Sequence, residues 1–220
     1  MPATTRRTTK LKHANVGELL DSLGVSASRV CLDPPPGRAT KRDLLKLDAA
    51  CGKLHELVER TLVEKVMGFA ESVYASELGR LLGNFVAEHN LGFVGGADAL
   101  IEFAPSLVRL PDVCFVSWDR CPDGTLPTAA IAKVIPNLVV EVLSRSNTET
   151  EIARKRGEYF RAGVELVWEI DPAARTAVVH TGPMNAVSLK ATGTLDGGTV
   201  LPGFTLPLAK LFDRRKPTGK

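Results

Sequence analysis

The sequence has no long apolar run. No stretch approaches the roughly 20 consecutive apolar residues that a helix needs to cross a bilayer. Residues 1–24 also lack the uninterrupted apolar core of a secretory signal. We therefore expect no membrane partner and no export, and we predict a cytoplasmic location.

Cysteine is scarce and lacks metal-binding spacing. The 4 cysteines include no C-x-x-C pair, and the 4 histidines are scattered along the chain. Structural zinc sites usually draw their ligands from closely spaced pairs of these residues. A zinc cluster is therefore not predicted, and buried or idle thiols are the simpler interpretation.

A strong excess of charge is also missing. The formal net charge of +3 is too small to identify a nucleic-acid-binding protein or to exclude one. Basic residues gather near the two ends of the chain, where solvated tails are the simpler interpretation: Arg6, Arg7, Lys10 and Lys12, and then Lys210, Arg214, Arg215, Lys216 and Lys220. The motifs G-x-G-x-x-G, G-x-x-x-x-G-K and G-x-S-x-G are absent, so no dinucleotide site, phosphate loop or nucleophile elbow is predicted.

The composition that is present suits one globular domain. The chain has 220 residues, of which 44% are hydrophobic and 24% charged. Three consecutive prolines in the segment 32–38 forbid regular structure and indicate a linker. We therefore expect an N-terminal extension over residues 1–30, a domain over 31–212 and a basic tail over 213–220.

Apolar spacing divides the first half of the chain into helices and a hairpin. The predicted elements are an amphipathic stretch at Val16–Leu23, a helix from Thr40 to Gly52, a β-hairpin over Leu54–Val66 and a long helix over Val73–His89.

The second half is richer in predicted strands. Short strands are predicted at Leu91–Val94, Leu100–Phe103, Val113–Ser117, Leu166–Ile170 and Ala177–His180. The run Leu138–Leu143 is nearly continuous in apolar residues, which is typical of a central strand buried on both faces. Thr148–Glu151 matches a capping box that opens a helix ending at Gly163. This order predicts an α/β fold in which helices flank a mixed central β-sheet, preceded by an N-terminal helix and a β-hairpin.

Glu141 is a carboxylate inside the otherwise apolar strand of residues 138–143. Burying an unpaired ionised carboxylate costs on the order of several kcal/mol, so Glu141 needs a metal, a cation or a hydrogen-bond network beside it. Asp112 directly precedes another apolar strand and is placed to share a metal with Glu141.

Two carboxylates at the ends of adjacent strands favour Mg²⁺, which keeps several waters and accepts phosphate oxygens as further ligands. This chemistry indicates hydrolysis of a phosphodiester. A structural alternative needs no metal: Asp112 forms a turn after Pro111, and Glu141 pairs with a buried arginine. The residues alone favour neither interpretation.

Lys155 is a charged residue on the predicted sheet-facing side of a helix. Ile152, Lys155 and Tyr159 share one face because their spacing is three and then four. A lysine there can orient a metal-bound water or stabilise charge on a phosphate. The alternative is an i,i+4 salt bridge with Glu151.

Several short motifs follow one another at fixed spacing. They are Pro111-Asp112, Glu141-Val-Leu-Ser144, Glu151-x-x-x-Lys155-x-x-x-Tyr159-x-x-x-Gly163-Val164-x-x-x-Trp168 and Ile170-Asp171-Pro172. Together they resemble the Uma-two family of restriction endonucleases, a branch of the PD-(D/E)XK nuclease superfamily. The resemblance extends over about residues 30–212 and includes the early segment Leu54-His-Glu-Leu-Val-Glu59. Each fragment is weak alone, but the combined spacing is specific.

The resemblance implies a restriction-endonuclease-like core with Asp112 and Glu141 as Mg²⁺ ligands and Lys155 as the catalytic lysine. The superfamily's parent pattern places this lysine two residues after the acidic residue, where this chain has Leu143. The resemblance implies that the lysine has moved to the following helix. Glu56 matches the family's early glutamate and is a candidate additional acidic residue.

Some positions depart from the family pattern. Arg145 replaces the usual proline, Glu151 stands where aspartate is common, and the segment 164–168 varies the usual tail. None of these departures removes a proposed catalytic group. Glu77, on the long predicted helix, is a weaker acidic candidate than Glu56.

The functional hypothesis is a Mg²⁺-dependent endonuclease that hydrolyses DNA phosphodiester bonds, with Mn²⁺ as a substitute cofactor. DNA is the expected partner. A homodimer is also expected if both strands are cut, because two strands need two sites. The alternative is a catalytically silent nucleic-acid- or protein-binding module on the same fold, since fold alone does not assign chemistry.

Overall fold

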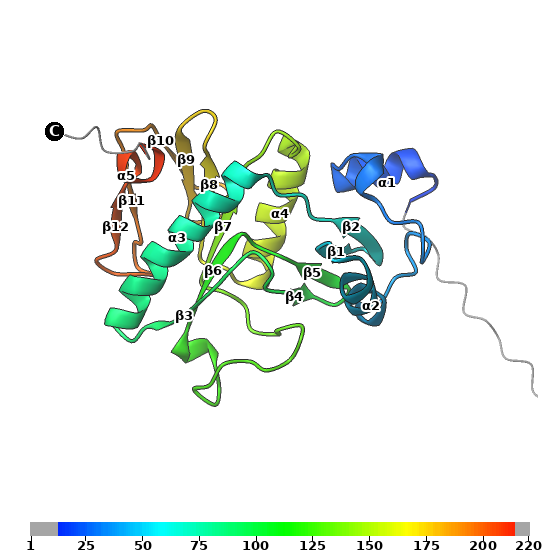
Figure 1. The fold of residues 1–220 in the computed structure, drawn as a ribbon, viewed down its shortest axis with the longest axis horizontal. Helices are drawn as coiled ribbons and strands as arrows, with labels where there is room; N and C mark the ends of the chain where they lie inside the picture. Colours follow the sequence, from blue (N-terminus) through cyan, green and yellow to red (C-terminus); the bar gives the residue numbers. More distant parts are fainter. Residues whose placement is uncertain (1–12, 214–220) are drawn as a thin grey trace, which may run out of the picture.

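The computed structural model describes residues 13–213 (Figure 1). The basic residues within positions 1–12 and 214–220 lie outside this range, so the expectation of basic tails falls almost entirely on residues that are not described. No helix within residues 13–213 is long and apolar enough to cross a bilayer.

A 6-stranded sheet forms the centre of the molecule, with strand order β10-β9-β8-β7-β6-β3. Its strands are β3 (Gly92–Gly95), β6 (Val113–Ser117), β7 (Leu138–Val142), β8 (Leu166–Asp171), β9 (Thr176–His180) and β10 (Ala186–Leu189). β7 pairs with β8 in parallel, and the other neighbours are antiparallel. The predicted mixed sheet with β7 as an internal, fully buried strand is therefore confirmed.

A 4-stranded sheet lies beside it, with strand order β2-β1-β5-β4. Its strands are β1 (His55–Val58), β2 (Thr61–Glu64), β4 (Ile101–Ala104) and β5 (Leu107–Arg109). β1 and β2 form the predicted hairpin. Its two-residue loop, Glu59 and Arg60, has φ values of 49° and 60°, as the favoured tight hairpin turns require.

Helices cover both faces of the central sheet. α3 (Phe69–Glu88) packs with the residues of β7 at positions 138, 140 and 142, whereas α4 (Glu149–Ala162) packs with Val139 on the opposite face. Since side chains alternate along a strand, Glu141 shares the face of Val139 and points toward α4. α2 (Lys41–Cys51) begins after Thr40 and ends at Gly52, as predicted; Thr40 and Asp43 also form a capping box that was not predicted.

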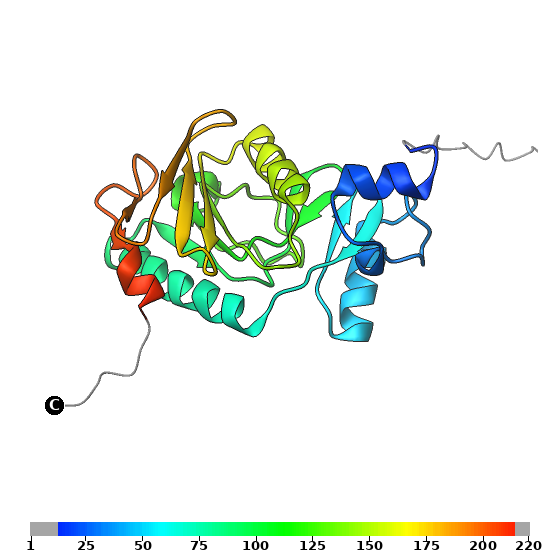
Figure 2. The same ribbon diagram turned by 90° about the horizontal axis from the view of Figure 1, so that it is seen from above.

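The N-terminal segment packs onto the same structure. It contains α1 (Val16–Leu23) and a short 3₁₀ helix, η1 (Ala27–Arg29). Leu19 and Leu23 pack against Val58 and Val63 of the hairpin, and α1 lies beside α4 (Figure 2). The expected division between an extension and a domain near residue 30 stays a prediction.

The C-terminal elements were not predicted individually. They are β11 (Thr194–Asp196), β12 (Thr205–Pro207) and α5 (Leu208–Phe212), and their apolar residues join the core under α3. Strands of three residues carry no measurable alternation, which also explains why β5 was missed. The long helix begins at Phe69, four residues before the predicted start at Val73. The prediction missed its first turn because that turn lacks the apolar spacing of a buried helix face, and Phe69 itself is 88% exposed.

Gly92 gives a test of the pairing between β3 and β6. It has a φ of 155°, and an added Cβ would lie 1.9 Å from the carbonyl oxygen of Val116. We expect Gly92→Ala to lower the free energy of unfolding by about 2 kcal/mol, because both the backbone and the neighbouring strand must shift. Urea unfolding measures this change.

Gly83 provides the matched control. It lies within α3, and an added Cβ would meet no atom within 4 Å. Gly83→Ala should raise stability by about 0.5–1 kcal/mol, because alanine is the better helix former. Equal stability of the two variants would contradict the close approach of β3 to β6.

Candidate active site

Asp112 directly precedes β6, and Glu141 lies on the neighbouring antiparallel strand β7. Val113 pairs with Val140, and Asp112 N also donates a hydrogen bond to Val140 O at 3.1 Å. Asp112 and Glu141 both line one small cavity together with Lys155 of α4.

The carboxylate of Asp112 is held at both oxygens. Oδ2 accepts a hydrogen bond from Val142 N at 2.7 Å, and Oδ1 lies 2.8 Å from Nζ of Lys65. Asp112 is only 4% exposed. Asp112 lies in a bend after Pro111, as the structural alternative expected, but its carboxylate also forms these two buried contacts.

Lys65 was not predicted as a site residue. Its ammonium group donates to Leu110 O at 2.6 Å and Ala97 O at 3.2 Å, in addition to its ion pair with Asp112. Three fixed acceptors hold Lys65 Nζ beside the Asp112 carboxylate. The local sequence gives no sign of this role, because the partners come from distant segments.

Glu141 contacts two residues of α4. Oε2 lies 3.2 Å from Nζ of Lys155, and Oε1 accepts a short hydrogen bond from the hydroxyl of Tyr159. Lys155 and Tyr159 are buried, as the spacing of the sheet-facing side predicted. The cation beside Glu141 is thus a lysine, and the alternative of a buried arginine is wrong.

Glu56 reaches the same lysine from β1. Oε1 lies 3.3 Å from Nζ of Lys155 and accepts from Leu110 N, while Oε2 lies 2.6 Å from Nη1 of Arg109. Glu56 is fully buried. Glu77, in contrast, lies on α3 and pairs with Arg80.

Burial and neighbouring charge set the ionisation of these groups. Burial raises the pKa of Glu141, Lys155 opposes this and Asp112 adds to it, so the net shift is upward. Burial alone would raise the pKa of Glu56, but Lys155, Arg109 and Lys65 lower it to about 2. Burial alone would lower the pKa of Lys155, but Glu141 and Glu56 raise it. Lys155 is therefore a cation at neutral pH, suited to stabilise negative charge and not to act as a base.

The charged groups surround a small enclosed cavity of about 10 Å³. Its lining includes Asp112, Glu141, Lys155, Lys65, Arg29 and Glu71. A space of this size holds about one water molecule or ion. Within residues 13–213, no group of three or more His, Cys, Asp or Glu side chains is arranged to hold a metal, so any metal here would rely on two carboxylates and on waters or substrate.

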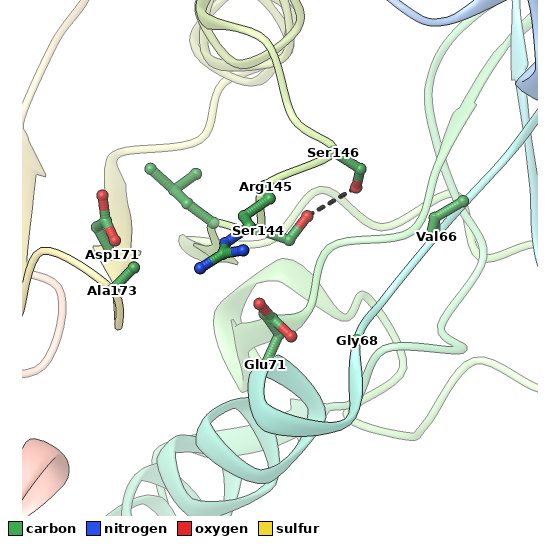
Figure 3. Close-up of a pocket in the computed structure, with 9 residues that line it drawn as sticks. Val66, Gly68, Glu71, Ser144, Arg145, Ser146, Asp171 and Ala173 are labelled. Atoms are coloured by element: carbon green, nitrogen blue, oxygen red, sulfur yellow. Dashed lines mark hydrogen bonds between the residues drawn. The ribbon is translucent and has the colours of Figure 1, made fainter.

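A larger open pocket of about 400 Å³ adjoins this cavity and shares Val66, Glu71 and Ser144 with it. Glu71 and Arg145 point into the pocket from opposite sides (Figure 3). Arg145 is exposed. The pocket therefore lies next to the cavity that the acidic pair lines.

The start of α4 differs from the prediction. Thr148 Oγ1 accepts a hydrogen bond from Glu151 N, as expected of a helix cap. The carboxylate of Glu151, however, turns to Arg29 and binds both of its terminal nitrogens at 2.9 Å. The complete capping box and the Glu151–Lys155 salt bridge are therefore wrong, and Arg29 is a further cavity residue that was not predicted.

The model of the Uma2 family, described as "Putative restriction endonuclease", matches residues 42–209. A crystal structure described as a "putative nuclease belonging to DUF820" from Anabaena variabilis ATCC 29413 is 20% identical, with a TM-score of 0.68 over 78% of this chain and 96% of that chain. No curated protein is significantly similar. The shared fold is that of a restriction-endonuclease-like core, and since the family model spans most of the sequence, the chain belongs to the Uma2 family.

Proposed function

We propose that this chain is a divalent-metal-dependent endonuclease that hydrolyses phosphodiester bonds in DNA. Membership of the Uma2 family supports nuclease chemistry in general. The observation that carries the finer proposal is the convergence of Asp112, Glu141 and Lys155 on one enclosed cavity. Two acids and a lysine that line one cavity suit metal-assisted phosphodiester hydrolysis.

Asp112 and Glu141 would hold the metal, as Mg²⁺ or as Mn²⁺. Carboxylate oxygens are the donors that these hard cations prefer, and Mg²⁺ commonly binds to only one or two carboxylates together with water and phosphate. The cavity between them has room for one ion. When bound, such a metal polarises the phosphate and lowers the pKa of a bound water.

Lys155 would act on the substrate directly. Its ammonium group is held by Glu141 and Glu56, at 3.2 Å and 3.3 Å. This fixed position lets it orient the attacking water or stabilise charge on a phosphate oxygen without reorganisation. Glu56 would act through Lys155, because its carboxylate is already bound to Arg109 and Leu110 N.

The adjoining pocket would receive the DNA backbone. Arg145 is exposed at its rim, and a guanidinium group there can contact a phosphate without reading the base sequence. Cleavage of both strands would require two copies of the site, so a homodimer belongs to the same proposal.

A specific observation favours the alternative of a silent binding module. Each carboxylate is already paired with a lysine, Asp112 with Lys65 and Glu141 with Lys155. The acids and Lys155 are also no more than 5% exposed. Absence of Mg²⁺ or Mn²⁺ binding by calorimetry, even with DNA present, would support this alternative over the enzyme.

Asp112→Asn tests the metal site. The substitution keeps the size of the side chain and removes its charge. We expect the affinity for Mn²⁺ to fall by at least about 100-fold, because loss of a ligand should exceed the 10–100-fold cost of losing a supporting partner. Calorimetry measures the affinity, and cleavage of plasmid DNA should disappear in parallel.

Asp123→Asn is the matched control, because Asp123 is exposed in the loop before β7. It should bind Mn²⁺ and cleave DNA as the wild type does. Unchanged Mn²⁺ affinity in Asp112→Asn would remove this residue from the metal site. Cleavage that persists in Asp112→Asn at the wild-type rate would indicate a contaminating nuclease.

Lys155→Met separates catalysis from metal binding. We expect turnover to fall by roughly 10²–10³-fold, because a preorganised charge at the reacting phosphate is lost. The affinity for Mn²⁺ should not fall, since Asp112 and Glu141 remain and a neighbouring cation is removed. Single-turnover cleavage and calorimetry measure the two effects.

The substitution also leaves Glu141 and Glu56 without their shared cation, so thermal stability should drop, and cleavage must be measured well below the melting temperature. Lys41→Met is the control, because Lys41 pairs with Glu102 away from the cavity. Wild-type turnover in folded Lys155→Met would refute a catalytic role for Lys155.

A further inference from the structure

The segment ahead of the family-matched region reaches the candidate site. The family model begins at residue 42, whereas Arg29 lines the enclosed cavity together with Asp112, Glu141 and Lys155. Arg29 is only 7% exposed. A residue that the family match does not cover therefore contributes to the wall of the acidic site.

Arg29 is fixed by contacts on two elements. Its terminal nitrogens each lie 2.9 Å from one oxygen of Glu151, and its Nε donates to Glu64 O at 2.8 Å. Glu151 is 1% exposed. A two-point arginine–carboxylate pair of this kind fixes orientation as well as distance.

Glu151 lies one helical turn before Lys155. Residues four apart lie one above the other on the same side of a helix, so the position of Glu151 determines where Lys155 projects. The pair of Arg29 and Glu151 therefore fixes the rotation and height of the first turns of α4 relative to Glu64 on β2.

Two residues a few positions before Arg29, Ser22 and Gly24, also contact the first half of α4 and its N-cap. Thr148 Oγ1 donates to Gly24 O at 2.6 Å, and Arg154 Nη1 donates to Ser22 O at 2.7 Å. Gly24 has a φ of 68°, and an added Cβ would lie 2.6 Å from Glu151 N. Only glycine allows this close approach, so the whole segment is fitted to the start of α4.

We propose that Arg29 is a positioning residue for Lys155, and that residues 22–29 form a clamp on the start of α4. Arg29 acts on Lys155 through Glu151, and this role needs no direct contact between Arg29 and Lys155. The inference rests on the proposed function in one respect, because its kinetic readout assumes that Lys155 acts on the substrate.

Arg29→Gln, Glu151→Gln and the double variant test the proposal. Each single variant should lower turnover by about 10–100-fold, as losses of supporting partners do, while Mn²⁺ affinity stays near that of the wild type. The double variant should be no slower than the slower single variant, because both remove the same pair. Wild-type turnover in Arg29→Gln, or additive losses in the double variant, would overturn the proposal.

Arg29→Lys decides the case in which Arg29→Gln does not fold. It keeps the positive charge but loses the two-point contact, so turnover should fall partly at unchanged Mn²⁺ affinity. Full turnover in Arg29→Lys would show that only charge is needed and would overturn the positioning role.

Arg120→Gln is the matched control. Arg120 donates a hydrogen bond to Gly163 O at the C-terminal end of α4 and forms an ion pair with Glu165. Its substitution should lower the melting temperature without lowering turnover. Equal loss of turnover in Arg120→Gln and Arg29→Gln would mean that any loosening of α4 has the same effect, which would overturn a specific role for Arg29.

Amide hydrogen exchange gives a readout that does not depend on cleavage. If the wild type cleaves no DNA, the proposed function fails, but the clamp can still be judged. Arg29→Gln should then speed exchange at residues 152–156 and leave α3 unchanged. Unchanged exchange at residues 152–156 would overturn the clamp itself.

Discussion

Lys155 carries a positive charge into the interior, where it is 3% exposed. It is balanced by Glu141 and Glu56, whose oxygens lie 3.2 Å and 3.3 Å from its Nζ. An uncompensated buried ion would cost on the order of several kcal/mol. Glu56 on β1 lies far along the chain from Glu141 on β7 and Lys155 on α4, and this need for charge balance fixes how these elements meet.

The same need joins the two sheets. Glu56 belongs to the 4-stranded sheet and Glu141 to the 6-stranded sheet, and Lys155 contacts both. Arg109 pairs with Glu56 and also with Glu158, so the chain of buried ion pairs continues away from the cavity. Removing one member leaves its neighbours charged and buried, which costs more than losing a surface pair. The residues that build the site thus also hold the fold.

Sequence reasoning found the site residues that are conspicuous in their own segment. Glu141 interrupts an apolar strand, and Lys155 lies on the apolar side of a helix, so each departs from a local pattern. Lys65 follows Glu64 just after β2, and Arg29 follows Ser28 at the end of η1, so neither charge interrupts an apolar pattern. Their partners are distant: Arg29 and Glu151 are 122 positions apart. Only the folded structure shows that such residues are paired. The three-residue strands β5, β11 and β12 are likewise visible only in the structure.

The site is electrically balanced before any cofactor is considered. Asp112 faces Lys65, and Glu141 faces Lys155. On the proposed function, a divalent cation would add two positive charges to a buried, balanced group, and burial of that excess is unfavourable. A phosphodiester brings one negative charge to the same place and reduces the excess. Metal and substrate should therefore assist one another's binding, and each favours the other by the same free energy because linkage is reciprocal. An acidic pair surrounded by lysines would in this way load its metal chiefly when DNA is present.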